Sequence, residues 1–450
     1  MRKYVYFIGI GGIGMSAIAR YYNHAGYIVS GYDKTPSPLT DELQKEGIEI
    51  HFEPQIESIP QDKENTLVIY TPAIPADMEE LVFVMNNGYR LIKRSRALGE
   101  IASEKRCLAV AGTHGKTTTS TMLAHIIQNS GEGATSFLGG ISKNYGTNLL
   151  LSNSDVLVAE ADEFDRSFLQ LKPSIAVITS MDADHLDIYN DEQTLIEAFK
   201  EFASGVSGSV VVKKGLEGNL AGICAKCYTY SYDDGGDFYP FDIRLNSDSR
   251  LTFSMNLCGE IVENCTVGVP GKVNVENAVA ASAVAYLHGT PVNEIREALK
   301  SFSGVKRRFD IRFEQNGILY IDDYAHHPRE LAASISSIKE IFPGRKLCAV
   351  FQPHLFSRTK DFYKEFAQSL SLADSVIMLP IYPAREEPLP GITSEIILER
   401  ITCPDAKLVE KSELISEIRD RELDILVTFG AGDIDRLVAP VENYLKEHYA

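Results

Sequence analysis

A segment rich in glycine and threonine, residues 111–119, holds the residue types that bind phosphate. It reads Ala-Gly-Thr-His-Gly-Lys-Thr-Thr-Thr. Backbone N–H groups of such a loop can approach phosphate oxygens, the lysine can neutralise the β- and γ-phosphates, and a threonine hydroxyl can reach Mg²⁺. We therefore expect a nucleotide with β- and γ-phosphates and Mg²⁺ to bind here, with Lys116 on the phosphates and Thr117 on the metal. The expected cofactor contacts are Gly112, Thr113, His114, Gly115, Lys116, Thr117 and Thr118.

The residues on either side of this loop predict the elements that must position it. An apolar run over residues 108–111 predicts a buried strand, and apolar residues at positions 122, 123, 126 and 127 recur at helical spacing. A strand, a glycine loop and a helix are the context that phosphate binding requires. The loop is shorter than the common phosphate-binding loop, which has four residues between its first glycine and the Gly-Lys pair.

A second glycine motif lies near the N-terminus, between a predicted strand (residues 4–10) and a predicted helix (residues 15–24). A second strand, residues 27–32, ends at Asp33, and a third, residues 66–70, ends at Thr71. This pattern predicts a Rossmann-like site for a diphosphate nucleotide. NAD(P), FAD and UDP-sugars all satisfy it, so the motif alone does not name the ligand. The expected substrate contacts are Gly11, Gly12, Gly14, Met15, Ser16, Asp33 and Thr71.

Acidic and histidine side chains follow two further strands. Glu160 is the first acid after a predicted strand over residues 155–159, where a Mg²⁺ ligand is needed beside a phosphate loop. We expect the neighbouring Glu163 and Asp165 to be solvent-exposed, as acidic runs usually are. His185, in the polar segment after a strand over residues 175–179, is predicted to be a metal ligand.

The second half of the chain alternates between strand and helix patterns. Residues 205–268 contain alternating segments that predict β-hairpins, for example residues 209–213 and 251–254, before an alanine-rich helix over residues 278–287. Predicted strands then cover residues 318–322, 346–351, 375–379 and 424–429, which indicates another mostly parallel sheet. Three of these strands end in polar clusters, which predict a ligand-facing edge.

Composition limits the class of protein. A chain of 450 residues, 44% hydrophobic and 24% charged, predicts a soluble protein of two or three domains. Its net charge of −18 without a basic patch argues against nucleic acid as a partner. Seven scattered cysteines fit a reducing compartment. Glycines interrupt the N-terminal apolar run, and no run is long enough for a membrane span, so we expect a cytoplasmic protein with no membrane partner.

Taken together, the motifs resemble those of the Mur ligases along nearly the whole chain, and within that family those of the alanine-adding branch. The resemblance implies an α/β protein of three domains. Residues 1–102 would form a Rossmann-like domain for a UDP-sugar, and residues 103–303 a central ATP and Mg²⁺ domain with added β-hairpins. Residues 304–450 would form a Rossmann-like amino-acid domain. The matching segments are residues 9–16, 111–119, 160–163, 182–187, 274–277, 306–309, 322–328, 351–354 and 430–433.

The resemblance also implies roles for individual residues. Thr117 and Glu160 would hold one Mg²⁺, and Glu160 with His185 a second. Asn274 and Asn277 would lie near the adenine. The chain departs from the family pattern at two positions. Val273 stands where relatives often have a histidine, and Leu355 where they often have an arginine. Near the ribose and γ-phosphate the resemblance places Arg307 or Arg308 with Asp322 or Asp323. Facing the sugar carboxylate and the amino acid it places His326, His327, His354 and Arg358.

The implied reaction is the ATP-dependent addition of L-alanine to UDP-N-acetylmuramate through an acyl phosphate, an early cytoplasmic step of peptidoglycan precursor synthesis. Either His326 or His327 could take the proton of the amine. Three alternatives stay open from sequence: a ligase that joins the same sugar nucleotide to a tripeptide, a nicotinamide-dependent dehydrogenase, and a non-catalytic nucleotide-binding module. A monomer and a homodimer are both compatible with the sequence. The expected catalytic residues are Lys116, Glu160, His185, His326, His327 and Arg358.

Overall fold

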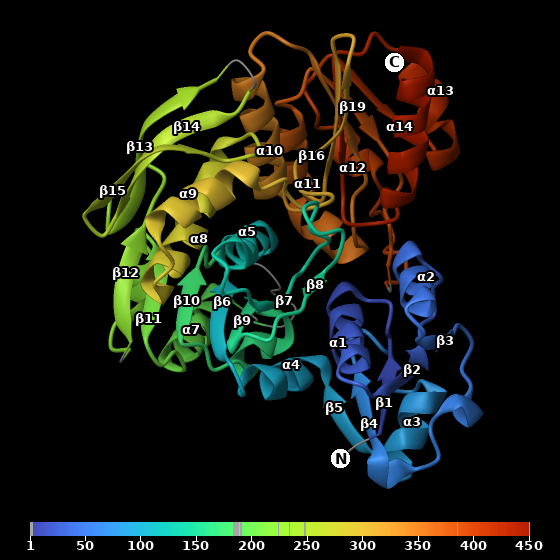
Figure 1. Cartoon of the computed structure of the whole chain (residues 1–450). Coiled ribbons are helices and arrows are strands. Elements are labelled where there is room, and N and C mark those ends of the chain that lie inside the picture. The colour runs from blue at the N-terminus through green and yellow to red at the C-terminus, as the bar shows by residue number, and fades with distance from the viewer. Residues whose placement is uncertain are drawn as a thin grey trace. The chain divides into compact units, whose positions relative to one another are not determined.

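A computed structural model describes residues 3–182, 189, 191–223, 225–233, 235–246, 249–384 and 386–449. It contains three β-sheets, each covered by helices (Figure 1). The chain divides into two compact units, which are described separately below. The first unit covers residues 1–243, 252–268 and 275–303, and the second covers residues 244–251, 269–274 and 304–450.

The N-terminal sheet has five parallel strands in the order β3-β2-β1-β4-β5. The first strand ends two residues earlier than predicted, because Gly9 has a φ of +89° and turns the backbone into the glycine motif. The strands are β1 (Tyr4–Ile8), β2 (Ile28–Tyr32), β3 (Glu49–His51), β4 (Thr66–Tyr70) and β5 (Arg90–Lys93). The helices are α1 (Ile13–His24), α2 (Pro38–Lys45), α3 (Glu79–Asn86) and α4 (Arg94–Ala102).

The central sheet has ten strands in the order β15-β14-β13-β12-β11-β10-β6-β9-β7-β8. Helix α5 lies beside β6 (Figure 1). Residues 112–115 connect the two, and we call this connection the phosphate-type loop. The strands are β6 (Arg106–Ala111), β7 (Thr135–Phe137), β8 (Leu149–Leu150), β9 (Val156–Ala161), β10 (Ile175–Ile178), β11 (Ser209–Lys213), β12 (Lys226–Tyr230), β13 (Phe238–Leu245), β14 (Leu251–Leu257) and β15 (Glu260–Thr266). The helices are α5 (Lys116–Asn129), α7 (Glu192–Ser204), α8 (Lys272–His288) and α9 (Val292–Ser301).

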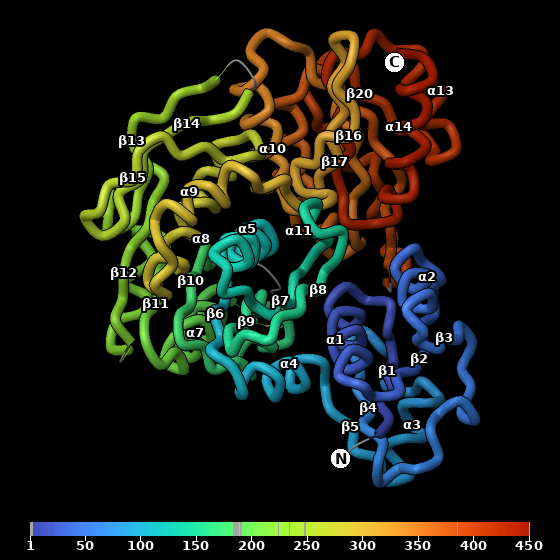
Figure 2. Tube along the Cα trace, in the orientation of Figure 1, coloured from blue at the N-terminus to red at the C-terminus, as the bar shows by residue number. Residues whose placement is uncertain are grey.

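Two local predictions in this sheet are wrong. Strand β11 is not part of a hairpin, since it pairs in parallel with both β10 and β12, whereas β14 and β15 do form the expected antiparallel pair. Glu160 does not follow its strand but lies inside β9, paired with Val110 of β6. The tube in Figure 2 follows the chain from β7 through a long loop back to β8, with which β7 pairs antiparallel.

The second unit contains the C-terminal sheet, in the order β16-β17-β21-β18-β19-β20. All pairs except β16 with β17 are parallel, so the ends of β17, β18 and β21 reach one edge, as predicted. Buried clusters of apolar side chains cover both faces. The strands are β16 (Asp310–Gln315), β17 (Ile318–Asp323), β18 (Leu347–Phe351), β19 (Ser375–Met378), β20 (Asp405–Leu408) and β21 (Ile425–Phe429). The helices are α10 (Pro328–Ile341), α11 (Phe356–Leu370), α12 (Glu395–Leu398), α13 (Leu414–Arg419) and α14 (Asp435–Tyr449).

Short 3₁₀ segments complete the described chain at Ile56–Ser58, Lys63–Asn65, Phe164–Gln170, Glu217–Leu220 and Lys411–Glu413. Among the described helices, none has the length and apolar character needed to cross a membrane.

Candidate active site

The loop between β6 and α5 has the backbone geometry of a phosphate cradle. Gly112 and Gly115 both have positive φ, +128° and +78°, which favours glycine. A Cβ atom on Gly112 would come within 2.1 Å of the Thr179 hydroxyl oxygen. Gly115 is the N-cap of α5 and supplies no side-chain cap to the first N–H groups of the helix. Those N–H groups, which include those of Thr117 and Thr118, are the donors that a phosphate accepts from.

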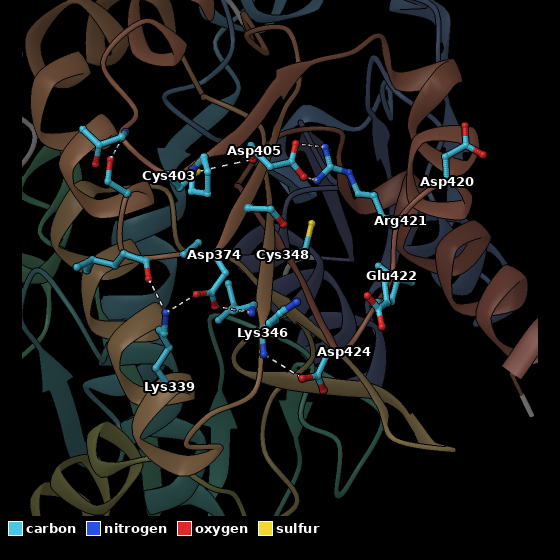
Figure 3. Close-up of a pocket in the computed structure, with 18 residues that line it drawn as sticks. Lys339, Lys346, Cys348, Asp374, Cys403, Asp405, Asp420, Arg421, Glu422 and Asp424 are labelled. Atoms are coloured by element: carbon cyan, nitrogen blue, oxygen red, sulfur yellow. Dashed lines mark hydrogen bonds and ion pairs between the residues drawn. The ribbon is translucent and has the colours of Figure 1, made fainter.

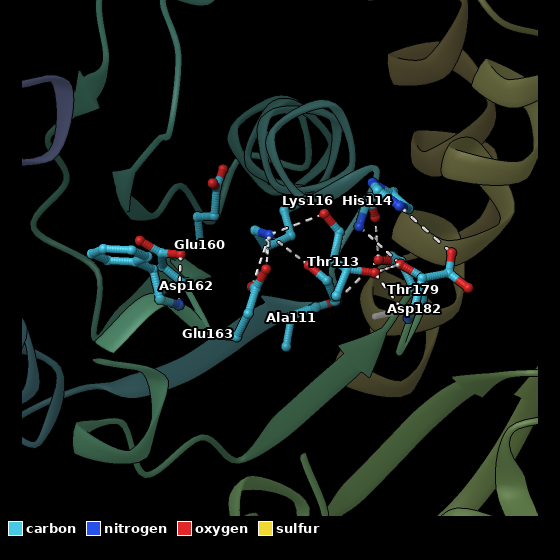
Figure 4. Close-up of polar contacts among 12 residues, drawn as sticks. Ala111, Thr113, His114, Lys116, Glu160, Asp162, Glu163, Thr179 and Asp182 are labelled. Carbon is cyan, nitrogen blue, oxygen red and sulfur yellow. Dashed lines mark hydrogen bonds and ion pairs between the residues drawn. The ribbon is translucent and has the colours of Figure 1, made fainter. Parts of the chain in front are cut away.

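Side chains from the end of β10 support this loop from behind. The hydroxyls of Thr113 and Ser180 lie 2.9 Å apart, and Ser180 Oγ accepts the His114 N–H at 2.8 Å. The Thr179 hydroxyl donates to the His114 carbonyl at 2.5 Å. His114 Nε2 lies 3.5 Å from an Asp182 carboxylate oxygen. The loop therefore has a fixed shape, which Figure 4 shows together with the acidic residues of the neighbouring strand.

Lys116 is held by an acid that we predicted to be exposed. Its ammonium donates to the Gly112 carbonyl at 2.6 Å and lies 2.9 and 2.8 Å from the two carboxylate oxygens of Glu163 (Figure 4). The Glu163 side chain is 0% exposed, so its prediction as a solvated residue is wrong. Asp165 is partly exposed and pairs with Lys93 at 2.7 Å. The acidic residues at positions 160–165 are close together in the sequence, and the sequence did not indicate which of their side chains is buried.

Electrostatics keep the lysine charged. Burial alone would lower the pKa of Lys116, but the carboxylates of Glu163, Asp162 and Glu160 raise it above its ordinary value. Burial raises the pKa of Glu163, although the ammonium of Lys116 opposes this shift. Lys116 therefore presents a full positive charge to the loop.

Oxygen donors suited to Mg²⁺ lie next to the same loop. Glu160 on β9 accepts a hydrogen bond from Ser120 of α5 at 3.4 Å, and Thr117 occupies the first turn of that helix. His185 lies outside the described residues, among which no group of three or more His, Cys, Asp or Glu side chains could hold a metal. Mg²⁺ usually binds through one or two carboxylates plus phosphates and water, so Glu160 and Thr117 fit it together with a bound nucleotide.

A small cavity of about 100 Å³ lies in front of Glu160. Its walls come from the start of α1, from α4, from the residues after β7 and from the end of β9. Arg94 and Asp162 line it and form an ion pair at 3.2 Å. The cavity brings Gly14 of the first glycine motif close to the predicted metal ligand, which sequence spacing alone did not indicate.

The N-terminal glycine motif is closed by Asp33. The Gly11 N–H donates to one carboxylate oxygen at 2.7 Å, and the Thr35 N–H donates to the other at 3.0 Å. Gly12 is the N-cap of α1 without a side-chain cap, as at the phosphate-type loop. Thr71 lies against Gly9, where an added Cβ would come within 2.7 Å of the threonine methyl. This geometry suits a diphosphate at the start of α1.

Met15 and Ser16 point into the protein interior and are 1% and 0% exposed. Ser16 Oγ accepts a hydrogen bond from the Asn148 amide at 2.9 Å, and the same amide donates to the Ile13 carbonyl at 2.6 Å. Asn148 in turn accepts from Arg20 at 2.5 Å. Asn148 thus connects the start of α1 to the central sheet. Sequence reasoning missed it because nothing local distinguishes it from other loop asparagines.

The predicted adenine contacts lie in the first turns of α8. The Thr119 hydroxyl donates to Asn277 Oδ1 at 3.2 Å, and Asn277 also lies beside Gly115. The Asn274 amide donates to the Pro270 carbonyl at 2.6 Å. The structure thus brings Asn277 next to the phosphate-type loop within the first compact unit. The adenine role of both asparagines stays a prediction.

At the edge of the C-terminal sheet, arginines and acids form a fixed cluster. Arg307 donates to Asp322 at 3.2 Å and to the Gly430 carbonyl at 2.7 Å. The guanidinium groups of Arg307 and Arg308 lie 5.2 and 4.7 Å from the centroid of the Tyr324 ring. Buried Asp323 accepts from Ser334 at 2.7 Å, and burial raises its pKa to about 6. Tyr324 is a member of this cluster that we did not predict.

The predicted histidines gather beside this cluster. The rings of His326 and His354 lie 6.2 Å apart, and His354 stacks on Tyr382 at 5.8 Å. His326 Nδ1 lies 3.0 Å from the Tyr324 carbonyl, so this nitrogen carries the proton. Burial, and then the charges of Arg358, Arg308 and His354, lower the pKa of His326 to about 3 against the opposing effect of Glu330. His326 is therefore neutral near pH 7.

His327 has a different position at the start of α10. It is the N-cap of the helix, and its Nδ1 accepts the Arg329 N–H at 3.4 Å. Leu355, which departs from the family pattern, has a φ of +71° immediately before α11. A β-carbon is strained in this backbone conformation, and such strain concentrates at functional sites.

A separate cavity of about 810 Å³ lies at the opposite edge of the C-terminal sheet, where β18 to β21 begin (Figure 3). Four of the charged side chains that line it form two ion pairs: Lys339 contacts Asp374 at 3.0 Å, and Arg421 pairs with Asp405. Ligands of parallel sheets bind at the carboxyl ends of strands. We therefore place the candidate site at the other edge.

Comparison with known proteins agrees with this arrangement. The chain matches the family profiles "Mur ligase family, catalytic domain" over residues 4–106, "Mur ligase middle domain" over residues 110–285 and "Mur ligase, glutamate ligase domain" over residues 307–432. It is 51% identical to the UDP-N-acetylmuramate–L-alanine ligase of Porphyromonas gingivalis, with 99% of each chain covered.

Solved structures agree as well. The UDP-N-acetylmuramate–alanine ligase of Thermotoga maritima has a TM-score of 0.84 and 29% identity, covering 98% of this chain and 99% of that chain. A murein peptide ligase from Psychrobacter arcticus shares the fold, with a TM-score of 0.73, 24% identity and all of both chains covered. The predicted three-domain α/β architecture is confirmed, and this chain belongs to the Mur ligase family.

Proposed function

We propose that this protein joins L-alanine to UDP-N-acetylmuramate in an ATP- and Mg²⁺-dependent reaction that releases ADP and phosphate. The observation that carries the proposal is the 51% identity, over 99% of both chains, to a ligase of that name. The cradle around Gly112 and Lys116 supports the use of ATP. The glycine motif closed by Asp33 supports a diphosphate sugar nucleotide. We also propose a cytoplasmic location, as expected from composition.

The chemistry requires activation of a carboxylate. The sugar carboxylate attacks the γ-phosphorus of ATP, ADP leaves, and an acyl phosphate forms; the alanine amine then displaces phosphate. Lys116 offsets negative charge on the phosphoryl group during transfer. When bound by Glu160 and Thr117, Mg²⁺ would supply further charge neutralisation and align the phosphates. The loop N–H groups of α5 orient the nucleotide.

One histidine is better suited than the other to accept a hydrogen bond from the amine. Because His327 Nδ1 accepts an N–H, its other nitrogen carries the proton when the ring is neutral. In His326 the proton is on Nδ1, so Nε2 carries a lone pair. We assign His326 Nε2 to orient the amine by accepting a hydrogen bond from it. With a pKa of about 3, the ring is too weak a base to keep the amine proton near pH 7.

The proposal is tested with two experiments. The first measures ADP release with UDP-N-acetylmuramate and either L-alanine or a murein tripeptide. A preference for the tripeptide would contradict our proposal and favour the ligase that joins the same sugar nucleotide to a tripeptide. The second uses UDP-N-acetylmuramate labelled with ¹⁸O in its carboxylate. Transfer of label to the released phosphate is expected from an acyl phosphate, and its absence would contradict the mechanism.

A further inference from the structure

Glu163 has the geometry of a residue that acts through the phosphate-binding lysine. Its fully buried carboxylate contacts the Lys116 ammonium with both oxygens, at 2.9 and 2.8 Å. Buried carboxylates are rare unless they are paired. The ordinary structural explanation, an acid that stabilises the fold by a surface contact, does not apply to a side chain with 0% exposure.

The backbone around Glu163 holds this carboxylate in place. The Tyr189 hydroxyl donates to the Glu163 carbonyl at 2.5 Å, and the Arg166 N–H donates to the same carbonyl at 2.9 Å. Asp165 and Arg166 both adopt left-handed conformations with φ of +53°. Two such residues in sequence are costly and persist only where the surroundings enforce them.

The N–H donors of the Lys116 ammonium are all directed at acceptors of the protein itself. An ammonium has three N–H donors, and those of Lys116 reach the Gly112 carbonyl at 2.6 Å, the Thr113 carbonyl at 3.4 Å and Glu163. A phosphate that enters the loop must therefore take a donor from one of these partners. Glu163 is the only carboxylate among the three, so its negative charge competes directly with the phosphate.

We propose that Glu163 is the positioning residue of Lys116: it holds the ammonium over the loop and lowers the affinity of the loop for nucleotide in exchange for a fixed lysine. This inference rests on the proposed role of the loop as the ATP site. It predicts opposite effects on binding and turnover, because removing the charge removes repulsion of the phosphates but also releases the lysine. A purely structural role would weaken both together.

The test uses Glu163→Gln, with ADP affinity measured by calorimetry and kcat measured by ADP release. We expect ADP to bind about tenfold more tightly, as loss of a negative charge next to the phosphate-binding ammonium allows, and kcat to fall at least about tenfold. Unchanged or weaker ADP binding would overturn the proposal. Because binding is measured without turnover, this result stands even if alanine proves not to be the substrate.

Two further variants separate charge from position. Glu163→Asp keeps the charge but shortens the side chain, so ADP affinity should stay within about twofold of wild type while kcat falls about tenfold; an unchanged kcat would contradict positioning. Asp165→Asn is the matched control, since Asp165 is partly exposed and pairs with Lys93. It should change neither quantity, and an effect equal to that of Glu163→Gln would overturn the assignment of this role to Glu163.

Discussion

The carboxylate of Glu160 lies directly against Gly139, so that a Cβ atom on the glycine would come within 2.2 and 2.4 Å of its two oxygens. The two residues come from different segments, Glu160 from β9 and Gly139 from the chain after β7. Contacts this short do not occur in real proteins, so only glycine leaves this carboxylate its place. The position of the predicted metal ligand therefore depends on a residue outside every motif that we used to predict it.

Gly139→Ala should consequently behave as a metal-site variant. We expect the Mg²⁺ concentration for half-maximal rate to rise about tenfold, because the methyl group displaces the carboxylate of Glu160. A Mg²⁺ titration of ADP release measures this. Gly218→Ala is the control, since it has an ordinary φ and no atom within 4 Å of the added Cβ. A titration like that of wild type would mean that Glu160 is not a metal ligand.

Asp33→Ala should weaken binding of the sugar nucleotide without affecting ATP. The carboxylate accepts the N–H groups of Gly11 and Thr35, so its loss releases the glycine turn as well as any direct contact to the ligand. We expect KM for UDP-N-acetylmuramate to rise about tenfold with KM for ATP unchanged. Steady-state kinetics with each substrate varied in turn are sufficient. Glu57→Ala, which replaces an exposed acid in the same domain, is the control. If Asp33→Ala has the same KM as wild type for each substrate, Asp33 is not part of the site.

Asn148→Ala should lower stability more than its size suggests. The substitution removes three hydrogen bonds, to the Arg20 guanidinium, the Ser16 hydroxyl and the Ile13 carbonyl. Ser16 still donates to the Ile13 carbonyl and Arg20 still contacts Glu42 and Glu46. Each lost hydrogen bond contributes about 1 kcal/mol, so we expect a loss of about 3 kcal/mol in unfolding free energy. Denaturant unfolding followed by circular dichroism measures it, with the exposed Asn86→Ala as control. A loss no greater than in that control would show that water replaces the asparagine.

Asp323 should make stability depend on pH in the acid range. Its pKa is about 6 in the folded protein against an ordinary value of 3.8, so the folded state binds the proton more tightly. The contribution of Asp323 to the free energy of unfolding therefore falls as pH rises from about 4 to about 6. At pH 7 the ionised carboxylate lowers that free energy by the full amount, about 3 kcal/mol. Asp323→Asn should be more stable than wild type at pH 7, and the difference should shrink as pH falls toward 4.

Unfolding measurements at several pH values between 4 and 7 compare the two proteins. The gain will be less than the full cost, because the asparagine keeps only one of the two oxygens that accept from Ser334 and Ala325. Exposed Asp361→Asn is the control. A constant difference between wild type and Asp323→Asn across this range would contradict a raised pKa.

Local pattern sufficed for much of the fold. The strand, loop and helix around Gly112 and Lys116 were predicted because glycine spacing and apolar periodicity are properties of neighbouring residues. The parallel C-terminal sheet was predicted for the same reason. Strand β11 was misassigned as a hairpin because an alternating segment of five residues looks the same whether its partners are parallel or antiparallel.

The sequence by itself determined the two glycine motifs, the candidate phosphate lysine and the sheet edge where the polar clusters gather, since each depends on residues close together in the chain. Only the tertiary structure decided that Glu163 turns inward to Lys116, that Asn148 holds the start of α1, and that Gly139 makes room for Glu160. These relationships join segments that are far apart in sequence or separated by a turn. Burial and hydrogen bonding there depend on which strands become neighbours, and no local pattern records that choice.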